Sequence, residues 1–183
     1  PDAKTGARSI KFEATHESGE TSYAYMKVFD VNIPVSTDTW LSFRTFPENE
    51  LSRHCTIDLI MTDGSTLRDS GAEDKDGVSM HPGAPHGIIN EWSETSCNIG
   101  SWLAGKTIDR ILIALDYGPD AGHFRCYFDD ISVFKKEIIS GTQGPYRVAD
   151  VQSLISYPNP TNSGMVTLDL SGINSGGNIF LQV

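Results

Sequence analysis

The sequence lacks any run of about eighteen consecutive apolar residues, so it predicts no membrane-spanning helix. Cations are also scarce, because 14 Lys and Arg stand against 24 Asp and Glu, giving a formal net charge of −10. Nucleic acids and anionic membranes need clustered cations, and both are therefore disfavoured as partners. An acidic chain suits a neutral partner such as a glycan, or Ca²⁺, although acidic surfaces also simply keep proteins soluble.

Cysteine is rare, and the three that occur, Cys55, Cys97 and Cys126, cannot all pair within the chain because their number is odd. None belongs to a C-x-x-C pair, which disfavours a zinc site. One disulfide plus one free thiol suits a secreted protein. Three buried thiols, which would pack as small hydrophobes, fit the sequence as well.

Helical periodicity is nearly absent, and short apolar runs bounded by Gly, Pro, Asn and Asp take its place, which is typical of an antiparallel all-β domain. The expected strands lie at 9–15, 23–35, 39–46, 53–62, 91–99, 108–117, 123–130 and 131–138. With one long loop at 69–89, these strands predict a two-sheet antiparallel β-sandwich of the jelly-roll type. A tight turn is expected at Asp63-Gly64 and one helical turn at 101–105.

A second, smaller unit is expected after this sandwich. The Gly-Thr-Gln-Gly-Pro run at 141–145 breaks the strand pattern, which predicts a main domain at 1–140 and a linker at 141–150. Further on, a Pro-Asn-Pro tripeptide excludes both helix and central strand, and alternation then restarts a strand at 165–170. Residues 151–183 are therefore expected to form part of another β-sandwich.

The segment at 157–164 reads Y-P-N-P-T-N-S-G. It resembles the opening of the C-terminal sorting domain of Bacteroidetes proteins exported by the type IX secretion route, an Ig-like β-sandwich that begins Y-P-N-P-x-x-x-G. The resemblance implies a protein that is secreted or held on the cell surface. Because the chain stops before the later strands of that family, we expect a fragment whose work is done ahead of this truncated tail.

Most of residues 20–134 carries a second set of motifs, found at 29–31, 41–43, 62–69, 105–117 and 124–131, together with Trp92. These motifs resemble a jelly-roll module attached to bacterial glycoside hydrolases, including some α-mannosidases. The resemblance implies a non-catalytic carbohydrate-binding module of a secreted polysaccharide-degrading enzyme. Such a module would hold an attached catalytic domain on polysaccharide or oligosaccharide.

Aromatic side chains are the natural glycan contacts, because the C–H faces of sugars stack on flat rings and polar neighbours hydrogen-bond to hydroxyls. Trp40 shares a face of its expected strand with Arg44, and Tyr127 shares one with Arg125. Tyr117 lies at a loop. These five residues are the predicted carbohydrate-binding set.

Adjacent Asp129 and Asp130 point to opposite faces of a strand, so one of them carries a charge that is costly without a partner. In carbohydrate-binding jelly rolls that the last strand resembles, an aspartate here binds structural Ca²⁺, which takes six to eight oxygen ligands. The resemblance implies further ligands near the first strand, where Glu13 and Glu20 are the candidates. A salt bridge from Asp130 to Lys or Arg is the alternative.

Other patterns are weaker. The stretch at 73–77 is only partly like an EF-hand loop, and a solvated acidic loop is the better interpretation. His81 and His86 share a loop, where contact with sugar or an internal hydrogen bond is favoured over a metal. With no G-x-S-x-G motif and no carboxylates forced into a deep pocket, catalytic residues are not predicted. A structural spacer without a ligand, and a small β-sandwich hydrolase or lyase, remain alternatives.

Overall fold

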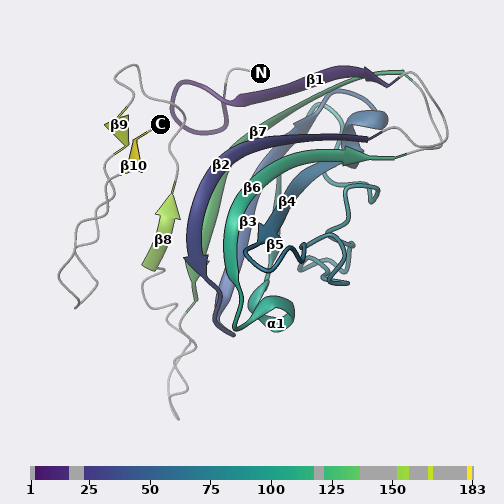
Figure 1. The fold of residues 1–183 in the computed structure, drawn as a ribbon. Coiled ribbons are helices and arrows are strands. Elements are labelled where there is room, and N and C mark those ends of the chain that lie inside the picture. The colour runs from purple at the N-terminus through teal and green to yellow at the C-terminus, as the bar shows by residue number, and fades with distance from the viewer. Residues whose placement is uncertain are drawn as a thin grey trace, which may run out of the picture.

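The computed structural model describes residues 3–16, 23–117 and 122–136, together with the backbone of three short strands beyond them (Figure 1). Those strands are β8 (Gln152–Ser156), β9 (Met165–Val166) and β10 (Leu181–Gln182). The linker at 141–150, most of the predicted sorting-domain segment and Glu20 lie outside the described residues. Within the described part, no helix is long and apolar enough to cross a membrane.

Two antiparallel sheets form the main body (Figure 1), which confirms the predicted all-β sandwich. Sheet A has the strand order β1–β7–β3–β5, and β8 pairs with the last part of β7; sheet B has the order β2–β6–β4. The strand bounds are β1 (Ile10–His16), β2 (Tyr23–Pro34), β3 (Thr39–Pro47), β4 (Cys55–Met61), β5 (Ser93–Cys97), β6 (Thr107–Asp116) and β7 (Gly122–Lys135).

Two short helical turns connect the sheets. The 3₁₀ turn η1 (Leu51–His54) carries the chain from β3 in sheet A to β4 in sheet B, and α1 (Gly100–Leu103) does so from β5 to β6. The turn expected at 101–105 is thus present as α1, one residue earlier. Each turn buries a side chain, Ser52 in η1 and Leu103 in α1.

Alternation of side chains builds the core between the sheets. In sheet A, Leu41 and Phe43 of β3 and Phe124 and Phe128 of β7 point inward and are buried. Their neighbours along each strand point outward and are half exposed. Sheet B supplies the opposite wall from Ile57, Leu59, Met61, Ile111, Ile113 and Leu115.

The two strands expected at 123–130 and 131–138 are one strand, β7, with a bulge. Asp130 has φ +50, and the register against β3 shifts between Ser42 and Arg44. A bulge adds one residue to a strand and so moves the following side chains to the other face. Inward positions therefore change from even numbers, as at Phe128, to odd numbers, as at Ile131.

The long segment between β4 and β5 folds back on the sandwich beside these two strands (Figure 1). The expected Asp63-Gly64 turn is present, and Leu67 N returns to donate to Leu59 O at 2.9 Å. Further along, Lys75 N donates to Ser96 O of β5 at 2.8 Å. The segment thus bonds to an edge of each sheet, and it also adds Leu67, Ala72 and Met80 to the core.

Candidate functional site

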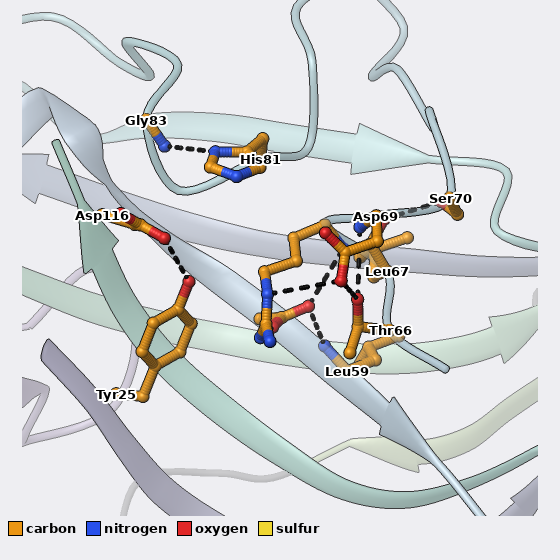
Figure 2. A network of polar contacts seen from close by, with 11 residues as sticks. Tyr25, Leu59, Thr66, Leu67, Asp69, Ser70, His81, Gly83 and Asp116 are labelled. Atoms are coloured by element: carbon orange, nitrogen blue, oxygen red, sulfur yellow. Dashed lines mark hydrogen bonds and ion pairs between the residues drawn. The ribbon is translucent and has the colours of Figure 1, made fainter. Parts of the chain in front are cut away.

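The outer face of sheet B holds a network of polar and aromatic side chains (Figure 2). The strand register aligns Tyr25 of β2 with Ala114 of β6, and Ala114 with Thr56 of β4. Arg68, from the segment after β4, reaches across this row to the ring of Tyr25. We call Tyr25, Arg68 and Asp58 the sheet B cluster.

Asp58 is the anionic centre of the cluster, and its side chain is fully buried. Arg68 Nη1 donates to Asp58 Oδ2 at 2.5 Å, while the backbone amides of Leu59 and Arg68 donate to Oδ1 at 2.9 and 3.1 Å. Burial raises the pKa of the Asp58 carboxyl, and Arg68 opposes that rise. A buried carboxylate needs such donors, so Arg68 is held in one place.

Tyr25 forms the aromatic side of the cluster. The Arg68 guanidinium carbon lies 4.7 Å from the centre of the Tyr25 ring, within the range of a cation–π contact. The Tyr25 hydroxyl donates to Asp116 Oδ2 at 2.8 Å (Figure 2). Burial, and then this hydrogen bond, raise the pKa of Tyr25, so the phenol stays protonated. The Tyr23 ring lies 5.7 Å away and is 66% exposed.

The end of the cluster near Asp116 is closed by a stacked pair and a loop. The rings of His54 and Tyr117 are parallel, with their centres 3.5 Å apart. His54 Nδ1 lies 2.8 Å from Gly83 O, and Gly83 N donates to His81 Nδ1 at 3.0 Å. A Cβ on Gly83 would come within 2.8 Å of Asp116 O, so glycine permits this close approach.

The predicted residues Trp40 and Arg44 lie on the outer face of sheet A, away from this cluster. The Trp40 ring has Lys136 Nζ 4.6 Å above it. Arg44 is paired with Glu94 at 2.8 Å and with Asp130 at 3.3 Å. The salt bridge of Asp130, which the sequence left as an alternative, is therefore present.

Arg125 and Tyr127 lie on the same outer face of sheet A. Arg125 Nε donates to Glu13 Oε1 at 2.8 Å, and Arg125 and then Lys11 lower the pKa of Glu13 to about 2. Tyr127 packs edge-on against Phe46, with ring centres 6.3 Å apart. Phe46 in turn contacts Trp92, which is thus part of an aromatic cluster on the sheet. Four of the five predicted carbohydrate contacts are on this face, and Tyr117 is at the end of sheet B.

The predicted calcium ligands are only partly gathered. Asp129 Oδ2 accepts the amides of Lys4 and Thr5 at 2.7 and 2.9 Å, and the Thr5 hydroxyl donates to Asp130 Oδ1. Glu13 lies opposite Arg125, four residues from Asp129 along β7 or about 13 Å. Among the described residues, three or more His, Cys, Asp or Glu are nowhere grouped to hold a metal. Protein donors, Arg44 among them, thus already contact both aspartates, and the ion remains a prediction.

The two loop histidines have separate surroundings. His81 accepts the hydrogen bond from Gly83 described above, which is internal to the loop. His86 is buried, and its Nδ1 lies 4.0 Å from Asp74 Oδ2; burial lowers the pKa of His86 to about 4. Asp74 Oδ1 also accepts the amides of Asp76 and Val78, so its carboxylate closes a turn at 73–77.

The sequence reasoning missed the sheet B cluster. The Tyr23-Ala24-Tyr25 order was available as a signal, because residues two apart share one face of a strand. Arg68 follows the turn expected at Asp63-Gly64, but its partner Asp58 lies ten residues away on the other side of that turn. Such a pairing depends on the conformation of the turn, which the sequence does not specify.

No family model matches the chain, and no curated protein matches it either. Several solved structures resemble it. A protein crystallised with a xylogluco-oligosaccharide is 16% identical with a TM-score of 0.46, over 72% of this chain and 32% of that one. The glycoside hydrolase domain of Endo-D from Streptococcus pneumoniae R6 is 14% identical with a TM-score of 0.42, over 69% and 18%.

Domains C and D of a third protein are 15% identical with a TM-score of 0.47, over 72% of this chain and 55% of that one. The chain therefore spans between less than a fifth and little more than half of the structures it resembles.

Proposed function

We propose that this chain is a non-catalytic carbohydrate-binding jelly-roll module of a secreted polysaccharide-degrading enzyme, and that a neutral glycan binds on the outer face of sheet B. The observation that carries the proposal is the exposed Tyr23 ring beside the ordered Tyr25–Arg68–Asp58 cluster. It joins a flat apolar surface to fixed hydrogen-bonding groups, the combination that sugar recognition needs.

The charges of this face favour a neutral sugar. Asp58, Asp69 and Asp116 contribute three carboxylates, and Arg68 is already bonded to Asp58 and lies 3.6 Å from Asp69. An anionic glycan at this cluster would meet the exposed Asp69 carboxylate beside an arginine whose charge Asp58 already balances. The exposed Asp69 carboxylate, in contrast, can accept hydrogen bonds from sugar hydroxyls.

Because the side chains of the cluster are already fixed in position, ligand binding costs less conformational entropy. Arg68 is held by Asp58 and by the Tyr25 ring before any ligand arrives, so binding does not have to immobilise this long side chain. Immobilising such a side chain costs about 0.5–1.5 kcal/mol. A weak single site can then act by proximity, because it keeps an attached catalytic domain near its substrate.

Two features support a non-catalytic role. Asp58 is fully buried and bonded to Arg68, so it is placed to hold the arginine rather than to contact a substrate. The pKa of Tyr25 is raised by burial, which makes the phenol a poor base near neutral pH. Glycoside hydrolysis needs two carboxylates across a scissile bond, and this arrangement does not provide that pair from Asp58.

The test is binding to a panel of neutral polysaccharides, measured by affinity gel electrophoresis, with Tyr23→Ala compared with Trp40→Ala. Tyr23 is largely exposed, so its replacement leaves the core intact. Loss of one aromatic contact should weaken binding about 3- to 10-fold, whereas Trp40→Ala on sheet A should leave it unchanged. Retardation by none of the polysaccharides would favour a structural spacer. If Trp40→Ala weakened binding and Tyr23→Ala did not, the binding site would lie on sheet A instead.

A further inference from the structure

Two of the three cysteines face the core from opposite sheets. Cys55 is the first residue of β4 in sheet B, and Cys126 lies in the middle of β7 in sheet A. Both are at most 1% exposed. Cys126 points inward together with its neighbours two residues away, Phe124 and Phe128. The two thiols therefore enter the same interior from opposite walls.

At one corner of the sandwich, the chain passes from one wall to the other close to both cysteines. Packed sheets are usually about 10 Å apart, whereas a disulfide needs Cα atoms about 4.4–6.8 Å apart. At this corner Pro47, the last residue of β3, pairs with Cys126, and the chain crosses directly through η1 to Cys55. A hydrogen bond joins η1 to β7, because Arg125 N donates to Ser52 Oγ at 3.0 Å.

The two thiols also influence each other. Burial raises the pKa of the Cys55 thiol, and the neighbouring Cys126 thiol raises it further through a side-chain hydrogen bond and charge repulsion. Cys97 has different surroundings: burial and then the nearby Asp74 carboxylate raise its pKa to about 12. Of the three possible pairings, the structure thus favours one.

We propose that Cys55 and Cys126 form a disulfide that joins the two sheets when the chain folds under oxidising conditions, and that Cys97 remains a thiol. One cysteine thiolate attacks a sulfur of a disulfide oxidant and releases a thiol, and the other cysteine displaces the second. The pair loses two protons and two electrons, and the oxidant disulfide is reduced to two thiols.

Burial sets the time at which this reaction occurs. Exchange requires in-line access of a thiolate to the oxidant, and both sulfurs are closed off in the folded sandwich. The bond therefore forms before the sheets close, and the folded protein protects whichever state it was folded in. Because the bond closes a loop of about 70 residues, it should raise the Tm by about 10 °C.

The test is to refold the full chain from urea in a glutathione redox buffer and, separately, in dithiothreitol. Thiols are then counted in denaturant with a chromogenic disulfide reagent, and the oxidised sample is mapped by mass spectrometry without reduction. We expect one thiol after oxidative refolding, three after reductive refolding, and a peptide pair linked through Cys55 and Cys126. Three thiols in both samples, or a link through Cys97, would overturn the proposal.

Variants separate the bond from packing effects. Cys55→Ala can lower the Tm simply by leaving a cavity, so the readout is the difference in Tm between the oxidised and reduced samples of each variant. Cys97→Ala should keep the difference of about 10 °C, and Cys55→Ala should abolish it. Equal differences in both variants would contradict the assignment, and rapid cross-linking of the folded, reduced protein would contradict the protection by burial.

Discussion

Arg68→Met would remove the guanidinium that Asp58 and Tyr25 share. Methionine keeps an unbranched apolar stem over the sheet, so the change acts mainly on the charge. The Asp58 carboxylate would then stay in a fully buried position with two backbone amides as its described donors. The cation–π contact with Tyr25 would be lost at the same time.

The size of the effect follows from burial. Breaking a buried ion pair from one side costs about 3–5 kcal/mol, because the remaining charge is uncompensated. Arg68 is 26% exposed, so water can reach the vacated position, and we expect the lower end, about 3 kcal/mol at pH 7. Burial already raises the pKa of Asp58, and losing Arg68 raises it further.

The pH dependence of the variant has a definite sign. A carboxyl whose folded pKa is above its unfolded value of about 3.9 binds a proton more tightly in the folded state. The resulting stabilisation is fully present below the unfolded pKa and is lost as pH rises through the folded pKa. The deficit of Arg68→Met should therefore be smaller at pH 5 than at pH 7.

Urea denaturation at both pH values measures this deficit. Arg110→Met is the matched control, because Arg110 is 47% exposed and pairs with the exposed Asp109, a contact expected to contribute less than about 1 kcal/mol. If Arg68→Met costs no more than the control at both pH values, the sheet B cluster does not depend on this ion pair. The double variant with Asp58→Asn should recover part of the loss.

Three further predictions concern stability. The pKa of His86 is about 4 when folded and about 6.5 when unfolded, so the free energy of unfolding should fall by up to about 1.4 kcal/mol per unit from pH 6.5 to 4; His86→Gln should remove that slope in urea titrations. Gly100→Ala should lower stability by about 1–3 kcal/mol in thermal melts, because its Cβ would lie 2.2 Å from Ser36 O. If Ca²⁺ binds at Asp130, EDTA should lower the Tm, and an unchanged melt would argue against the ion.

Alternation and turn residues were enough to predict the strands of both sheets. β3 alternates buried and half-exposed residues along its whole length, and its predicted range, 39–46, differs from the observed strand by one residue. The Asp63-Gly64 turn was equally local, since glycine takes up the positive φ of +84 that the turn requires. Patterns of this kind depend on neighbours in sequence, and the sequence therefore contains them.

The site was harder to predict because it depends on which face of each sheet is covered. Arg125 and Tyr127 share an outward face, as expected. However, Arg125 is hydrogen-bonded to Glu13, and the Tyr127 ring packs against Phe46. The bulge at Asp130 moved the inward positions of β7 by one residue. A single added residue reverses every following side chain, and the alternation alone does not reveal where that happens.

By itself the sequence determined a two-layer β structure, its turns and its acidic character, because strand periodicity, glycine and proline geometry and net charge are local or additive properties. Only the tertiary structure decided that Arg68 crosses β6 to meet Tyr25, and that Cys55 lies near Cys126 rather than Cys97. Both outcomes depend on how distant strands are ordered and how sheets meet at a corner. Contacts of that kind follow from packing between distant segments, and the local sequence of one segment does not specify them.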